Sequence, residues 1–141
     1  METKPQVPRG IRNNNPLNLR KGNNWQGERP VQNDKAFEEF TSMEYGIRAG
    51  FIILRKYISG YNGLTRRFNT IEQIIRRWAP PTENATQKYI DQVAKESGIS
   101  PRLKLSFRDK KSMCAIVSAM IHVECGQHVD MSLIESGYDM V

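Results

Sequence analysis

The sequence predicts a mainly α-helical domain with a small irregular, partly β lobe near its N-terminus. Residues 11–40 show no helical period and are rich in Asn, Gly and Pro, which favour turns. After residue 41, apolar side chains recur at the spacing of amphipathic helices. Candidate capping residues and helix-ending glycines bracket these apolar segments. These observations indicate one helical unit that follows a turn-rich start.

Length and composition favour a single domain over residues 11–141, preceded by a flexible arm over residues 1–10. The chain has 141 residues, of which 38% are hydrophobic and 26% are charged, as is typical of a globular protein. The arm contains Pro5, Pro8 and Gly10, and its composition lacks the apolar stretch of a signal peptide. The longest apolar run is too short to cross a bilayer, so no membrane insertion is expected.

The basic charge predicts attraction to polyanions. The formal net charge is +6 and the isoelectric point is about 9.5. The Lys and Arg residues occur in short, scattered pairs, and we find no zinc-finger, RNP or helix-turn-helix signature, so nucleic acid is not the expected partner. Cys114 and Cys125 lie eleven positions apart on one predicted helix, too far apart for a disulfide. With His122 and His128 they are poorly spaced for zinc, so we expect no metal and no cofactor.

Five helices are predicted after the lobe, and each has its own boundary signals. Within the lobe itself, the stretches Leu17–Arg20 and Ala36–Phe40 have the character of short extended segments. Capping-box patterns open the first two helices and the last, while Asn84 or Thr86 caps the third and Asp109 opens the fourth. The predicted helices are residues 41–60, residues 70–78 before Pro80-Pro81, residues 84–98, residues 109–125 and residues 132–137, with a loop over residues 62–69.

Glu124 is the most informative residue in the chain. The helix over residues 109–125 carries an apolar stripe made of Met113, Ile116, Val117, Met120 and Ile121. One further turn of that stripe falls on Glu124, just before the helix-stopping Gly126. Partial burial and the negative end of the helix dipole both favour the protonated form of a carboxyl group placed there. Such a group suits general-acid catalysis, although a solvated side chain at a frayed helix end is the simpler interpretation.

Four motifs in order resemble phage-associated and effector-type peptidoglycan hydrolases of the lysozyme-like superfamily. The stretch over residues 12–20, followed by Trp25-Gln26-Gly27, resembles the "NNPxNIR…WxG" start of that family. The ending Ala119-Met120-Ile121-His122-x-Glu124-x-Gly126 is similar to its "AMIxHENG". The segments over residues 37–49 and 77–90 supply the other two matches, so the resemblance spans roughly residues 10–138. Cys125 departs from the pattern, because many relatives have Asn or Ser there.

The resemblance implies a lysozyme-like fold with a circularly permuted chain order, in which the acid-bearing helix comes last. Glu124 then acts as the general acid that protonates the glycosidic oxygen between N-acetylmuramic acid and N-acetylglucosamine. This order requires Glu124 to lie close to the Asn13–Asn18 loop. A second carboxylate across the cleft implies hydrolysis by water. Without one, the substrate's own hydroxyl attacks and gives an anhydro product, as in lytic transglycosylases.

Further candidates come from the matched motifs, and each also has a structural interpretation. Glu44 is the first candidate for a second catalytic carboxylate, but the third position of a capping box is itself a structural role. Tyr89 lines the active site by resemblance, or packs in the core. Asparagine amides and an indole ring suit sugar binding, and they equally suit turns and packing. The predicted substrate-binding residues are Tyr89, Asn13, Asn14, Asn15, Trp25 and Glu83, and Asp34 and Glu28 are further lobe carboxylates that could face the cleft.

The sequence therefore predicts an enzyme that degrades peptidoglycan glycan strands, of the lysozyme (muramidase) or lytic transglycosylase type. The protein is expected to be made in the cytoplasm and to reach the cell wall through lysis, virion delivery or contact-dependent secretion. An immunity or delivery partner is left open. Two alternatives stand beside this prediction. One is a catalytically inactive glycan-binding or virion module of the same fold, and the other is a basic nucleic-acid-binding helical domain.

Overall fold

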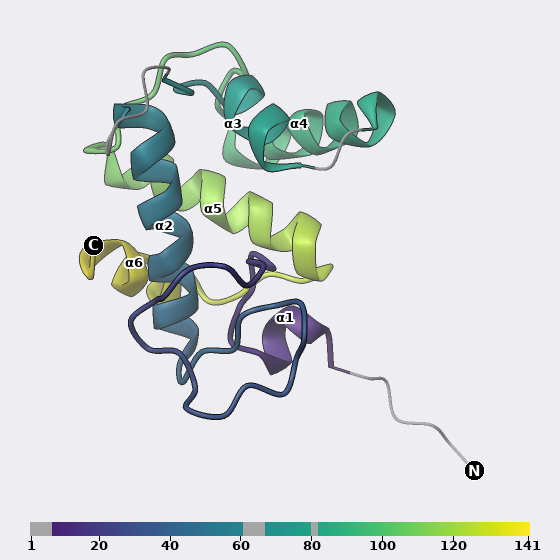
Figure 1. Cartoon of the computed structure of the whole chain (residues 1–141). Coiled ribbons are helices and arrows are strands. Elements are labelled where there is room, and N and C mark those ends of the chain that lie inside the picture. Colours follow the sequence, from purple (N-terminus) through teal and green to yellow (C-terminus); the bar gives the residue numbers. More distant parts are fainter. Residues whose placement is uncertain (1–6, 61–66, 80–81) are drawn as a thin grey trace.

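The computed structural model describes residues 7–60, 67–79 and 82–141, with the side chains of Glu83 and Asn84 excepted. The described chain is mainly helical, as predicted (Figure 1). Its helices are α1 (Arg9–Arg12), α2 (Met43–Ser59), α3 (Ile71–Trp78), α4 (Glu83–Ser97), α5 (Lys110–Cys125) and α6 (Met131–Asp139). Within the described ranges, no helix combines the length and the apolar character that a membrane span requires.

Helix α5 runs through the middle of the molecule, packed against α4 on one side and α6 on the other (Figure 1). The five residues of its predicted apolar stripe are all buried. Asp109 caps its first turn by accepting a hydrogen bond from the Ser112 amide, and Gly126 ends it in the left-handed conformation. Cys114 and Cys125 are free and buried, as expected. Burial raises the pKa of each thiol to about 11, so both stay protonated at neutral pH.

Three predicted helix starts are wrong by one to four residues, because a different residue occupies the N-cap position of each helix. Ser42, not Thr41, accepts the hydrogen bond from the Tyr45 amide at the start of α2. Helix α4 begins at Glu83, so Asn84 and Thr86 lie inside it rather than capping it. Asp130 caps α6, which starts before Ser132 and continues past Gly137. The Thr70 cap of α3 is confirmed, and the predicted loop over residues 62–69 lies mostly outside the described residues.

The N-terminal lobe is irregular rather than β. Among the described residues it contains two isolated antiparallel bridges, Arg20 with Phe37 and Glu28 with Phe40. Its organisation comes instead from asparagine side chains. The Asn15 amide donates to the carbonyls of Leu19 and Glu38 and accepts from the Leu19 amide. These bonds satisfy buried backbone groups that a sheet would otherwise pair.

The folded domain begins earlier than residue 11. Gly10 belongs to α1 and is buried, and a Cβ atom added to it would lie 2.6 Å from Cys125 Sγ. The guanidinium carbon of Arg9 lies 3.6 Å from the centre of the Phe37 ring. The predicted flexible arm is therefore wrong for residues 9 and 10, because both are packed against distant parts of the chain. Residues 1–6 of the predicted arm lie outside the described residues.

Two glycines on α2 let the lobe lie directly on that helix. A Cβ atom at Gly46 would approach the Asn14 carbonyl oxygen to 1.9 Å, and one at Gly50 would meet the Leu17 side chain at 2.2 Å. The four-residue spacing places both glycines on the same face of α2. The backbone carbonyl cannot move aside without breaking the asparagine network of the lobe. This contact positions the Asn13–Asn18 loop, which the functional site uses.

Glu38 and Glu39 are buried, although glutamates are mostly exposed in proteins. Their side chains are only 3% and 4% exposed. Glu39 accepts hydrogen bonds from the backbone amides of Asn33 and Asp34, and so holds the loop over residues 32–39 together. Burial, together with the neighbouring Glu28 carboxyl group, raises the pKa of Glu38 to about 7. The lobe thus contains one carboxyl group that folding favours in its protonated form.

Gly46→Ala should destabilise the protein, because the added methyl group meets a backbone carbonyl that cannot move aside. Overpacking of this kind costs about 1–3 kcal/mol. Ser59→Ala, at the exposed end of the same helix, should stay within about 0.5 kcal/mol of wild type. Urea unfolding followed by circular dichroism measures both. Equal stability of the two variants would mean that the lobe does not pack on α2 through Gly46.

Glu38→Gln should make the protein more stable above pH 7 and change little at pH 5. A carboxyl group whose pKa rises from 4.5 to about 7 on folding stabilises the fold below pH 4.5 and loses that contribution as the pH rises through 7. The neutral amide removes this loss, so the free energy of unfolding at pH 8 should rise by roughly 1–3 kcal/mol. Glu39→Gln is the control, because it weakens bonds to backbone amides and should destabilise the lobe. Unfolding curves at pH 5 and pH 8 that show no difference for Glu38→Gln would contradict this assignment.

Candidate active site in a cleft beside α5

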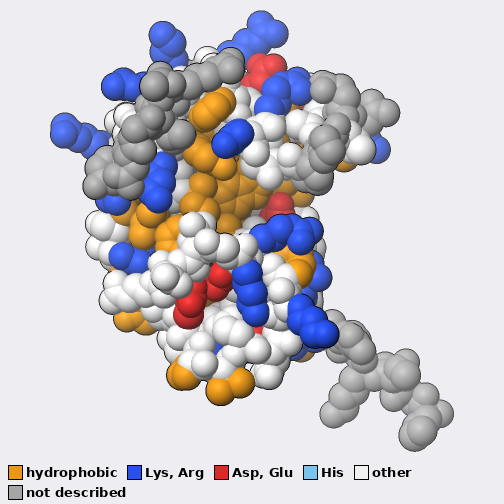
Figure 2. All heavy atoms as spheres, in the orientation of Figure 1, with side chains coloured by type: hydrophobic (Ala, Val, Ile, Leu, Met, Phe, Trp, Pro, Cys, Tyr) orange, Lys and Arg blue, Asp and Glu red, His pale blue; other side chains and the backbone are white. Residues whose placement is uncertain are grey.

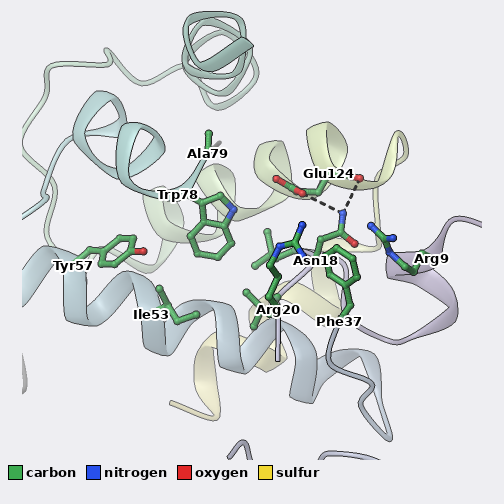
Figure 3. Close-up of a pocket in the computed structure, with 11 residues that line it drawn as sticks. Arg9, Asn18, Arg20, Phe37, Ile53, Tyr57, Trp78, Ala79 and Glu124 are labelled. Atoms are coloured by element: carbon green, nitrogen blue, oxygen red, sulfur yellow. Dashed lines mark hydrogen bonds between the residues drawn. The ribbon is translucent and has the colours of Figure 1, made fainter. Parts of the chain in front are cut away.

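A cleft of about 520 Å³ opens between the lobe and helices α2, α3 and α5. Figure 2 shows this hollow on one face of the molecule, with an apolar floor. Glu124 lies in its wall, at the end of α5 (Figure 3). A second hollow of about 390 Å³ adjoins the first and shares Glu124 and Ala79 with it. Glu124 therefore faces both hollows.

Two side chains hold the Glu124 carboxyl group from opposite sides. Asn18 Nδ2 donates to Glu124 Oε1 at 3.1 Å and to the Glu124 backbone carbonyl at 3.2 Å. The Tyr89 hydroxyl donates to Oε2 at 3.0 Å. Each carboxyl oxygen thus has one partner, and the group is fixed in orientation while it stays half-exposed in the cleft. The predicted proximity of Glu124 to the Asn13–Asn18 loop is confirmed by this contact.

Tyr89 stays protonated at neutral pH, so it remains a hydrogen-bond donor to Glu124. Burial, and then the negative charge of Glu124, raise the pKa of Tyr89 well above its usual range. Its ring is buried against α5, and its hydroxyl reaches Glu124 beside the second hollow. The ring therefore packs in the core, and the hydroxyl helps to fix the orientation of the Glu124 carboxyl group.

Asn18 was not predicted as a site residue, although it lies within the first matched motif. Its backbone is in the left-handed conformation, with φ of 52°, which asparagine tolerates better than most residues. That conformation turns its side chain toward the end of α5. The signal in the sequence is the asparagine directly after Pro16-Leu17. The resemblance implies that Glu124 lies near this loop, but it does not single out Asn18 as the residue that contacts it.

The rest of the cleft is aromatic, aliphatic and basic. Trp78 ends α3 and faces the cleft, opposite Ile53 and Tyr57 of α2 (Figure 3). At the other end, Arg9 and Arg20 both lie over the Phe37 ring, with guanidinium carbons 3.6 Å and 4.7 Å from its centre. Glu124 is the one acidic side chain among the described residues that line this cleft.

The other predicted site residues are placed differently. Asn13 donates to the Asp34 carboxylate, Asn14 donates to the Phe40 carbonyl, and Asn15 bonds backbone within the lobe. Their amides are occupied in building the lobe, and Asn13 and Asn15 are buried. They position Asn18 rather than line the cleft.

The described residues that line this cleft do not include Trp25 or the carboxylates Glu44, Asp34 and Glu28. Glu44 lies in the first turn of α2, a favourable position for a negative charge. Trp25 packs against the core, and its backbone amide donates to Glu28. Asp34 accepts bonds from the amides of Ala36 and Phe37, which lower its pKa to about 2. The Glu83 side chain lies outside the described residues.

Asn18→Asp should destabilise the protein at neutral pH by replacing a donor to Glu124 with a second carboxylate. The aspartate still accepts the left-handed backbone, so the lost bond and the repulsion dominate, at about 1–3 kcal/mol. The two adjacent carboxyl groups hold a proton more readily in the folded state than in the unfolded state. The loss of stability relative to wild type should therefore shrink as the pH falls from 7 to 4. Asn18→Ala is the matched variant and should show a deficit that does not change with pH. Equal urea midpoints for Asn18→Asp and wild type at pH 7 would contradict the contact.

Comparison with known proteins adds one relative. No family model matches the chain. Protein P5 of Pseudoalteromonas phage PM2 is 42% identical over 127 residues, which cover 87% of this chain and 74% of that protein. The expected phage association is supported by this similarity. Because the identity extends over most of both chains, the chain belongs to the family of Protein P5 of Pseudoalteromonas phage PM2.

Proposed function

We propose that this chain cleaves the glycan strands of peptidoglycan, with Glu124 as the general acid. The observation that carries the proposal is the carboxyl group of Glu124, which Asn18 and Tyr89 hold in the wall of a cleft. A general acid must be fixed in orientation and still be accessible to substrate. Glu124 meets both conditions. The four motifs shared with lysozyme-like peptidoglycan hydrolases support the same role for this residue.

The walls of the cleft suit an amphipathic, anionic polysaccharide. Sugar rings bind on aromatic faces, and Trp78, Tyr57 and Phe37 line the cleft. Muramic acid residues carry lactyl and peptide groups with carboxylates. Arg9 and Arg20 lie at the end of the cleft beside Asn18, where they can bind such carboxylates through charge-assisted hydrogen bonds. The overall positive charge also favours residence on an anionic cell wall.

The absence of a second acidic group from the described lining favours the transglycosylase outcome. In this mechanism Glu124 gives its proton to the glycosidic oxygen as the bond from that oxygen to the muramic acid C1 breaks. The C6 hydroxyl of the same sugar then attacks C1, and its proton returns to the Glu124 carboxylate. The product carries a 1,6-anhydro ring, and no water is consumed. Glu44 is then a helix-start residue and not a catalytic one.

The proposal includes a lysozyme-like fold with permuted chain order, and action on the bacterial cell wall. The partner is the glycan strand itself, and no metal or cofactor takes part in the acid catalysis. Membership in a phage protein family supports this site of action, because phages must pass the cell wall to infect and to leave a host. A catalytically inactive, glycan-binding form of the same cleft is the second candidate. It is favoured by the same observation, that the described residues lining the cleft include no acidic side chain besides Glu124.

Glu124→Gln should abolish the release of muropeptides from purified peptidoglycan. The amide keeps the size of the side chain but has no proton to give, so the rate should fall by about 100-fold or more. Glu44→Gln, on α2 outside the cleft, is the matched control and should keep wild-type activity. Mass spectrometry of the soluble products distinguishes the chemistry. Anhydro ends are expected, and reducing ends would show hydrolysis by water instead.

Two other outcomes would change the proposal. If wild type releases nothing but co-sediments with peptidoglycan, the inactive binding form is the correct interpretation. If Glu124→Gln cleaves as fast as wild type, Glu124 is not the acid. The circular dichroism spectra of both variants must match that of wild type, so that a change in activity can be assigned to the side chain and not to misfolding.

A further inference from the structure

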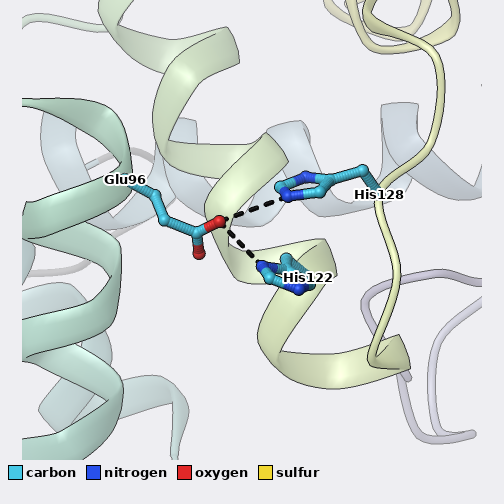
Figure 4. Close-up of side chains that lie close together, drawn as sticks. All are labelled: Glu96, His122 and His128. Carbon is cyan, nitrogen blue, oxygen red and sulfur yellow. Dashed lines mark hydrogen bonds and ion pairs between the residues drawn. The ribbon is translucent and has the colours of Figure 1, made fainter.

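Glu96 of α4, His122 of α5 and His128 lie close together (Figure 4). His122 Nδ1 lies 2.7 Å from Glu96 Oε1, and His128 Nε2 lies 3.3 Å from the same oxygen. The two imidazole rings are 4.1 Å apart at their centres. One ligand atom from each residue lies within 4.8 Å of the others. These three residues are called the Glu-His-His cluster below.

The chemistry of the Glu-His-His cluster matches that of a transition-metal site. Two imidazoles and one carboxylate are a common ligand set for Zn²⁺, which leaves a fourth position for water. Bonds of about 2.0–2.2 Å to one ion place its ligand atoms roughly 3–3.5 Å apart. The distances from Glu96 Oε1 to His122 Nδ1 and to His128 Nε2 are already near that separation. His128 lies in the connection between α5 and α6 with 54% of its side chain exposed, so it has room to adjust.

A second layer of hydrogen bonds orients the carboxylate. Gln92, one turn earlier on α4, donates to Glu96 Oε2 at 3.1 Å and leaves Oε1 directed at the two histidines. Supporting bonds of this kind are characteristic of metal ligands, because they fix the orientation of the groups that contact the ion.

We propose that the Glu-His-His cluster binds one divalent transition-metal ion, Zn²⁺ being the best match. The site is separate from the proposed active site, because His122 precedes Glu124 by two residues and so lies about 200° around α5. It joins α4 to the connection that follows α5. A bound ion therefore holds together the two helices that carry Tyr89 and Glu124, without touching substrate.

Zinc binding tests this directly. The full chain without a histidine tag is titrated with ZnCl₂ by calorimetry in a non-chelating buffer. One ion per chain and a higher midpoint of thermal unfolding are expected. Glu96→Gln and His128→Ala should each weaken binding by at least about tenfold. Asp91→Asn is the matched control, because Asp91 lies on the same helix, is exposed and bonds Gln87 rather than the cluster. It should bind zinc as wild type does.

Cobalt reports which atoms bind. Co²⁺ added to the full chain should give the weak visible bands of nitrogen and oxygen ligation. It should give no thiolate charge-transfer band, because Cys114 and Cys125 are buried away from solvent. A thiolate band, no zinc binding by wild type, or wild-type affinity in both ligand variants would each overturn the proposal. In the second case the cluster is an ion pair that joins the two helices without metal.

Discussion

The last turn of α5 is held against residues 10–18, and the candidate site at Glu124 depends on that contact. Gly10 leaves room for Cys125, whose thiol donates to the Pro16 carbonyl at 3.0 Å. Asn18 bonds both the backbone and the side chain of Glu124. These contacts join two segments that are more than a hundred residues apart in the chain. Without them the cleft would lose one wall and Glu124 would lose one of its two partners.

The same contact explains how a carboxylate can sit at the end of a buried helix. The apolar stripe of α5 anchors the helix in the core, so the position of its last turn is fixed to within the tolerance of close packing. The lobe then covers one side of that turn, because Gly46 and Gly50 let it lie on α2. Glu124 emerges where the core, the lobe and α4 meet. A polar group at such a junction is oriented without being removed from solvent.

Much of the helical architecture could be predicted, because it depends on local signals. The spacing of apolar residues located α2 to α6, and Gly126 marked the end of α5. The first residue of a helix is harder to predict, because neighbouring residues such as Thr41 and Ser42 can both cap a helix and only packing selects one. The lobe was harder still. Glu38 and Glu39 look like surface residues, and their burial depends on loop amides that no periodic pattern reveals.

The residues of the candidate site also divide into those that the sequence could predict and those that it could not. Glu124 and Tyr89 could be predicted from helix pattern and resemblance, and they lie together. Asn18, Trp78 and the two arginines come to the cleft through tertiary contacts, so a list of residue types could not select them. Asn13, Asn14 and Asn15 show the converse. Amides suited to sugar binding are instead occupied by the backbone beside them.

The long separation between Asn18 and Glu124 has a consequence for biosynthesis. A ribosome delivers the lobe first and the end of α5 more than a hundred residues later. Closing so large a loop is slow and costly in entropy, so the helices must gather before the two ends meet. A nascent chain therefore carries no complete cleft until Glu124 has been synthesised. Synthesis halted partway leaves fragments in which the carboxyl group and its partners never come together.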